Sequence, residues 1–221
     1  MTWDEYVIAW SGLHGGFDPR RASPLVRGWV RAAYEVGSWL GRRRVTPLSV
    51  TLGGVLLCLA VPLVALAGTT GLALAAVLVL LAAAADGLDG AVAVITDRVT
   101  RAGFVYDSVA DRLGESAWLT AFWLAGAPGW LVVLAGAASW LHEYLRARAT
   151  AAGMPDIGVV TVGERPTRVA VTITALALAY LSTIVMPTST SLILTAGVAS
   201  WLVLQAAGLV QLIAAVRVAL R

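Results

Sequence analysis

The sequence predicts an all-α integral membrane protein with six transmembrane helices, an N-terminal amphipathic surface helix and both termini in the cytoplasm. The first observation is composition: 59% of the 221 residues are hydrophobic and 13% are charged, whereas about 25% are charged in a soluble domain. The second is that apolar segments of about 20 residues recur, which is the length that crosses a bilayer. The third is that arginines gather in a few connections. These features exclude a soluble globule, a disordered chain and a disulfide-rich secreted domain.

The N-terminal segment, residues 1–44, is expected to lie outside the hydrocarbon core. Residues 1–23 are polar and mixed, and we expect them to be irregular. After Ser23, apolar residues recur at helical spacing with arginines between them, a pattern typical of a helix that lies in a membrane surface. A helix that packs on the cytoplasmic side of its own protein is the alternative. The apolar positions are Leu25, Trp29, Ala33, Val36 and Leu40.

Six spans are predicted in the second domain, residues 45–221. The first-to-second, third-to-fourth and fifth-to-sixth connections carry no charge. The arginines lie before the first span, near the other two connections and at the C-terminus, which places both termini in the cytoplasm by the positive-inside rule. We expect the protein in the cell (cytoplasmic) membrane. The spans are 47–67, 71–95, 103–126, 130–150, 168–187 and 189–216.

Aspartates interrupt the apolar pattern where the second and third spans meet the cytoplasm. A carboxylate in mid-membrane costs about 2.5–3.5 kcal/mol on insertion scales, so this group needs compensation. Helical spacing places the group on two stripes, and the short link between the spans lets the stripes face each other. Convergent carboxylates with small residues beside them predict a Mg²⁺ or Mn²⁺ site. The first stripe is Asp86, Asp89, Gly90 and Ala93, and the second is Gly103, Asp107 and Asp111.

A simpler alternative is that these aspartates only form ion pairs with interfacial arginines. Arg98, Arg101 and Arg112 are near enough in sequence to pair with one or two of them. The fixed spacing of the whole set favours the metal site, because random placement would rarely produce it.

The pattern Asp86-x2-Asp89-Gly90-x2-Ala93-x9-Gly103-x3-Asp107-x3-Asp111 resembles the signature of the CDP-alcohol phosphotransferase family. The resemblance extends over residues 45–217. The one departure is Val94, where the family has arginine, and Arg98 lies one helical turn further on as a possible substitute.

This resemblance implies a dimeric membrane enzyme that transfers a substituted phosphate from a CDP-linked alcohol to a hydroxyl and releases CMP. It implies two Mg²⁺ or Mn²⁺ ions, held by Asp86, Asp89, Asp107 and Asp111 at an active site that faces the cytoplasm. Asp111 would also be the catalytic general base. The cytidine nucleotide would bind at Asp86, Gly90, Ala93 and Gly103.

Two further segments, His142–Ala149 and Gly163–Arg168, resemble segments of actinobacterial phosphatidylinositol-phosphate synthases. By this resemblance Arg146, Arg168 and Arg217 would bind the phosphate of the acceptor, a task that suits the planar guanidinium. The alternative is that these arginines only mark the cytoplasmic side and contact lipid headgroups.

The expected function is therefore transfer of a phosphatidyl group from CDP-diacylglycerol to a polar, phosphorylated alcohol such as inositol phosphate or glycerol 3-phosphate. The expected partners are membrane lipids and a second copy of the chain, and no nucleic acid. Three alternatives stay open: a cardiolipin-type synthase with phosphatidylglycerol as acceptor, a non-catalytic relative, and an ion transporter that uses the aspartates as a relay.

Overall fold

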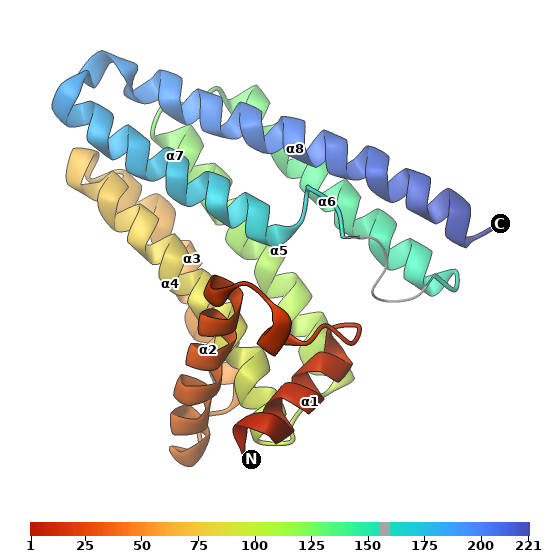
Figure 1. Cartoon of the computed structure of the whole chain (residues 1–221). Coiled ribbons are helices and arrows are strands. Elements are labelled where there is room, and N and C mark those ends of the chain that lie inside the picture. The colour runs from red at the N-terminus through yellow and green to blue at the C-terminus, as the bar shows by residue number, and fades with distance from the viewer. Residues whose placement is uncertain (155–159) are drawn as a thin grey trace. The chain divides into compact units, whose positions relative to one another are not determined.

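The computed structural model describes residues 1–154 and 160–221, except for the side chain of Leu25 (Figure 1). Leu25 was one of the apolar positions of the predicted surface helix, and its side chain thus lies outside the described part. The described residues form helices and no strand, so the predicted all-α class is confirmed. The helices are α1 (Trp3–Leu13), α2 (Pro24–Arg42), α3 (Pro47–Ala65), α4 (Gly68–Ile95), α5 (Arg101–Leu124), α6 (Gly129–Ala151), α7 (Arg165–Val185) and α8 (Thr190–Ala219), with 3₁₀ turns η1 (Pro19–Arg21) and η2 (Pro187–Ser189).

Among the described residues, four helical segments are long and apolar enough to cross a membrane: α3, α4, α7 and the segment from Pro187 to the end of α8. Helices α5 and α6 have 24 and 23 residues, but charged side chains interrupt residues 101–115 of α5 and 143–148 of α6. Long apolar side chains are exposed on the candidate spans, as a lipid environment allows. Leu63 on α3 and Val210 on α8 are 70% and 69% exposed. The chain is thus a membrane protein.

The chain forms two compact units. Unit 1 contains residues 1–56 and 81–111, and unit 2 contains residues 57–80 and 112–221. Helices α3, α4 and α5 therefore contribute residues to both units. The predicted metal ligands all belong to unit 1, and the predicted acceptor-binding arginines all belong to unit 2.

Unit 1 begins with a helix that the sequence reading did not expect. Residues 1–23 were expected to be irregular, but Trp3–Leu13 form α1. A capping box starts it: the amide of Glu5 donates to Oγ1 of Thr2 at 3.4 Å, and the amide of Thr2 donates to Oε2 of Glu5 at 2.7 Å. These bonds satisfy amides that a short helix would otherwise leave open.

Helix α2 of unit 1 is present at the predicted residues, and its side chains fit both interpretations of that helix. One face packs on α1 and on the end of α4, where Tyr6, Val30, Ala91 and Val94 form a buried cluster. Trp29 and Trp39 are 47% and 49% exposed, as interfacial anchors would be. Contact with the rest of unit 1 is thus established, and contact with the membrane surface remains a prediction.

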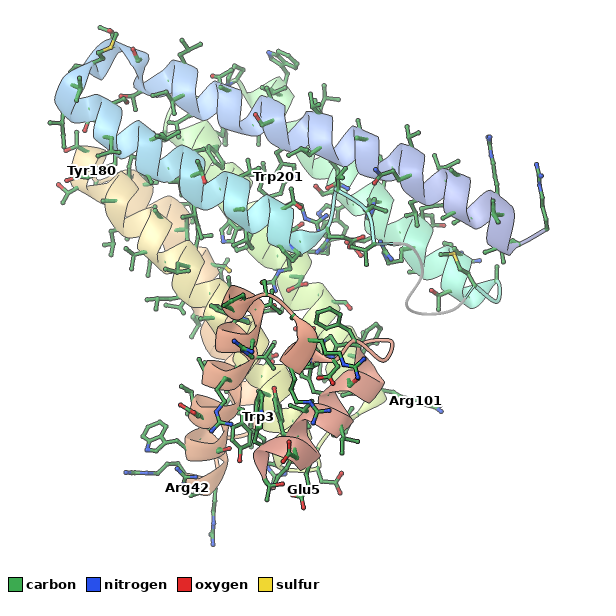
Figure 2. All side chains as sticks on the ribbon, in the orientation of Figure 1. Trp3, Glu5, Arg42, Arg101, Tyr180 and Trp201 are labelled. Atoms are coloured by element: carbon green, nitrogen blue, oxygen red, sulfur yellow. The ribbon has the colours of Figure 1, made fainter. Side chains whose placement is uncertain are left out.

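Unit 2 is built around α8, which packs along α6 and α7. Trp201 of α8, labelled in Figure 2, is 1% exposed and donates its ring N–H to Oγ of Ser139 on α6 at 2.8 Å. Trp118, Phe122, Leu176 and Leu194 fill the same interior and are fully buried. This packing holds the halves of α5, α6 and α7 that present the charged side chains of unit 2.

Candidate active site

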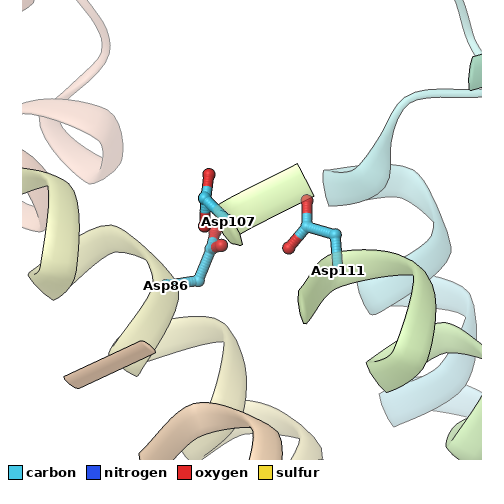
Figure 3. Close-up of side chains that lie close together, drawn as sticks. All are labelled: Asp86, Asp107 and Asp111. Atoms are coloured by element: carbon cyan, nitrogen blue, oxygen red, sulfur yellow. The ribbon is translucent and has the colours of Figure 1, made fainter. Parts of the chain in front are cut away.

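Three of the predicted carboxylates lie together in unit 1. Asp86, Asp107 and Asp111 each offer one oxygen, and these oxygens all lie within 4.8 Å of one another. Figure 3 shows the three side chains pointing toward a shared space, Asp86 from α4 and the other two from α5. Asp107 and Asp111 are four residues apart, so they occupy the same face of α5. All three are half-buried.

The short link between α4 and α5 fixes where these helices begin and end. Asp97 has φ +54°, a left-handed conformation that aspartate adopts more readily than most residues. Oγ1 of Thr100 accepts a hydrogen bond from the amide of Gly103 at 3.0 Å, which caps the first turn of α5. Asp107 therefore lies nearly two turns after the capped start of α5.

The fourth predicted ligand, Asp89, is held differently. Its side chain is buried, at 6% exposure, and its Oδ2 accepts a hydrogen bond of 2.6 Å from Oγ1 of Thr51 on α3. Asp89 is not one of the three residues whose oxygens lie together. Sequence reasoning missed Thr51, and the available signal was a hydroxyl, one of two with Ser49, in the first half of an apolar span.

The predicted nucleotide-binding positions differ in the space around them. At Gly90, a Cβ would have no neighbouring atom within 4 Å, so open space lies beside the aspartate stripe. At Gly103, a Cβ would lie 3.0 Å from Oγ1 of Thr100, so a side chain there would fit only if Thr100 shifted. Ala93 is half-buried on the same stripe of α4 as Gly90.

The three carboxylates fit a divalent cation in number, chemistry and spacing. Mg²⁺ takes oxygen ligands at about 2.0–2.1 Å, so two ligand oxygens of one ion lie about 3–4 Å apart. The oxygens of Asp86, Asp107 and Asp111 are within 4.8 Å, so small side-chain rotations would suffice. Like charges at this spacing repel by about 3 kcal/mol per pair at an effective dielectric constant of about 20. A bound cation would offset that repulsion.

Val94, at the position of the family arginine, faces away from solvent. It is 7% exposed and belongs to the apolar cluster with Tyr6 and Val30. Burial in this environment raises the pKa of Tyr6 to about 12. Arg98, the possible substitute, is exposed. A valine at position 94 is thus explained by the packing of α1 and α2 against α4.

Arg168 lies in a buried ionic network in unit 2. It is 2% exposed, and its Nε lies 2.7 Å from Oε1 of Glu115. Its two other nitrogens contact Glu143 at 3.2 Å and the backbone oxygen of Gly163 at 2.7 Å. Arg112 pairs with the same two glutamates at 3.0 and 3.1 Å. The two arginines and the two glutamates therefore neutralise one another's charge between the helices.

Arg146 has a different environment in the same unit. Its guanidinium donates to Oε1 of Glu164, and its side chain is 21% exposed. Oε1 of Glu164 also accepts from the amide and the hydroxyl of Thr161, both at 3.0 Å. Nε2 of His142, which is fully buried, lies 3.0 Å from the same hydroxyl. Arg217 is exposed in the last turn of α8.

Comparison with known proteins identifies the family. Residues 44–218 match the family model described as CDP-alcohol phosphatidyltransferase, so the chain belongs to this family. An archaetidylinositol phosphate synthase of Pyrococcus horikoshii is 37% identical over 95 residues, which are 42% of this chain and 50% of the relative. The chain thus matches half the length of that relative.

Solved structures of the phosphatidylinositol phosphate synthase PgsA1 of Mycobacterium tuberculosis share the fold. The structure with CDP-DAG bound has a TM-score of 0.67 and 25% identity, and covers 84% of this chain and 94% of that chain. The complex with manganese and citrate has a TM-score of 0.66 and 24% identity, with 84% and 88% covered.

Proposed function

We propose that this chain is a metal-dependent transferase that moves a phosphatidyl group from CDP-diacylglycerol to the hydroxyl of a polar alcohol and releases CMP. The observation that supports this most directly is the convergence of Asp86, Asp107 and Asp111, inside the segment that matches the family. The name of the M. tuberculosis neighbour, whose structure holds CDP-DAG, supports the same donor.

In the proposed reaction, the acceptor oxygen attacks the phosphorus of the phosphatidyl group. A new P–O bond forms, the P–O bond to CMP breaks, and CMP leaves with the electron pair. The acceptor proton passes to Asp111, the general base. A Mg²⁺ or Mn²⁺ ion bound by Asp86, Asp107 and Asp111 would supply positive charge beside the donor diphosphate. We assign Asp89 to the same metal site, where its bond to Thr51 orients it, and we expect two ions.

We assign the cytidine nucleotide to Asp86, Gly90, Ala93 and Gly103. The open space at Gly90 supports this assignment, because a flat base or a phosphate can approach backbone only where no side chain intervenes.

For the acceptor we propose a phosphorylated alcohol, inositol phosphate or glycerol 3-phosphate. Arg146 is the direct candidate for its phosphate, because it is partly exposed at the surface of unit 2. The bonds of Arg168 favour a supporting role, in which it holds the start of α7 through the backbone of Gly163. Arg217 would add charge from the end of α8. The names of both relatives support an inositol phosphate acceptor.

For topology we propose six spans, with α5 and α6 as the two that carry charges, and with both termini and the active site on the cytoplasmic side of the cell membrane. The gathering of arginines in a few connections supports this arrangement. We also propose a homodimer, with residues 45–221 as the catalytic domain and residues 1–44 as its surface segment.

The test is CMP release by purified protein with CDP-diacylglycerol and Mg²⁺ or Mn²⁺. The acceptors are inositol phosphate, glycerol 3-phosphate, free inositol, serine and phosphatidylglycerol, and the control is Asp111→Asn. We expect acceptor-dependent CMP release that falls at least about 100-fold in the variant, as loss of a general base predicts. Phosphatidylglycerol as the best acceptor would instead indicate a cardiolipin-type synthase. Folded protein that releases no CMP with any acceptor would contradict the proposal.

A further inference from the structure

We propose that Glu164 sets the affinity for the acceptor by occupying Arg146 whenever acceptor phosphate is absent. The inference rests on the proposed function, because it takes Arg146 as the residue that binds this phosphate. A carboxylate of the protein and a phosphate of the acceptor would then compete for one guanidinium.

The bonds of Glu164 are those of an anion in a binding site. Its Oε1 accepts from the guanidinium of Arg146, from the backbone amide of Thr161 and from the hydroxyl of Thr161. Backbone N–H, hydroxyl and guanidinium are also the donors that bind phosphate oxygens in proteins. Glu164 is the residue immediately before α7, but its side chain makes no capping bond to that helix. The carboxylate is therefore committed to Arg146 and Thr161.

The bonds of Arg146 leave room for exchange. Glu164 binds the guanidinium through Nη2, while Nε is buried and has no hydrogen-bond partner among the described residues. The two side chains are 21% and 24% exposed, so an incoming anion can reach the pair. A phosphate carries up to two charges and can bind two guanidinium nitrogens at once, whereas Glu164 binds one.

Arg168, in the same unit, is an arginine whose protein partners an incoming anion could not readily replace. It is 2% exposed and is bound by Glu115, Glu143, Gln205 and the backbone of Gly163. An anion would have to break all of these bonds to reach it. The competition therefore concerns Arg146 and Glu164 alone.

The variant Glu164→Gln isolates the charge. Glutamine keeps the shape of the side chain and an oxygen that accepts from Thr161, but it binds Arg146 without a negative charge. Apparent affinity for acceptor scales with the fraction of molecules in which Arg146 is available. We expect KM for inositol phosphate to fall about two- to fivefold, the range of a partly exposed ion pair. We expect kcat, and KM for CDP-diacylglycerol, to stay unchanged.

The experiment uses the full-length protein and two measurements. One is CMP release as a function of inositol phosphate, with free inositol as the acceptor that lacks a phosphate. The other is calorimetric binding of inorganic phosphate, which requires no turnover. Arg148→Gln, an exposed arginine two residues further along α6, is the matched control. The double variant Glu164→Gln/Arg146→Gln should lose the gain.

Tighter phosphate binding in Glu164→Gln that disappears in the double variant supports the inference. Unchanged or weaker phosphate binding in Glu164→Gln overturns it, because Glu164 would then only hold Arg146 in position. Absence of CMP release from the wild-type protein with every acceptor would overturn the proposed function instead. The phosphate-binding measurement still decides whether Glu164 competes for Arg146.

Discussion

Gly90 has open space beside it on the aspartate stripe of α4. A Cβ at this position would meet no protein atom within 4 Å, so Gly90→Ala should fold normally, and alanine even favours a helix by about 1 kcal/mol. The methyl group would instead enter the proposed nucleotide space. We expect KM for CDP-diacylglycerol to rise about tenfold, because the methyl group would displace the substrate by a fraction of an ångström.

Gly53→Ala is the matched control for Gly90→Ala. Gly53 lies on α3 of the same unit, and a Cβ there also meets nothing within 4 Å, but it lies outside the aspartate stripes. Thermal stability should rise by about the same amount as in Gly90→Ala, and donor KM should stay unchanged in this variant. Equal donor KM values for the Gly90 and Gly53 variants would contradict the assignment of the nucleotide to Gly90.

At the scale of secondary structure, the packing of α1 and α2 against α4 explains why position 94 is a valine. Tyr6 and Val30 close over this valine, so an arginine at position 94 would bring its charge into an apolar cluster without a partner there. We expect Val94→Arg to destabilise the protein by about 2 kcal/mol or more, the cost of burying an unpaired charge, and not to lower KM for CDP-diacylglycerol. Thermal denaturation and donor titration measure these two effects.

Val94→Met separates charge from size in this test, since methionine is long, flexible and uncharged. It should lose less stability than Val94→Arg. A Val94→Arg variant with normal stability and a lower donor KM would show instead that the position still faces the nucleotide, as the family arginine suggests.

The same elements show how far the sequence predicts the structure. Hydropathy and spacing predicted the ends of α2 to α8 within a few residues, because both are properties of residues that are neighbours in the sequence. Spacing also predicted the convergence of Asp86, Asp107 and Asp111. It missed α1, whose Thr2-x-x-Glu5 capping box is a local signal, and the bond of Asp89 to Thr51. That bond depends on how α3 packs, which no local pattern encodes.

At the scale of the whole molecule, most charged side chains of α5 and α6 that belong to unit 2 form ion pairs within that unit. Arg168 pairs with residues 53 and 25 positions earlier in the chain, Glu115 and Glu143. The sequence identified Arg168 as a functional arginine but could not indicate these partners, because they are set by tertiary contacts. Their mutual pairing lets charged side chains lie in helices that we propose to cross the membrane.

This pairing leads to a prediction about stability. Arg168→Gln would remove a guanidinium that contacts both Glu115 and Glu143, while the pairs of Arg112 with the same two carboxylates remain. Removing one member of a buried pair costs about 3–5 kcal/mol, so we expect a strongly lowered midpoint of thermal denaturation. The double variant Arg168→Gln/Glu115→Gln restores neutrality and should lose less than the sum of the two single variants. Strict additivity would show that Arg168 and Glu115 are not energetically coupled. An Arg168→Gln variant as stable as the exposed control Arg148→Gln would show that Arg168 does not stabilise the interior, and would return it to the candidates for direct phosphate binding.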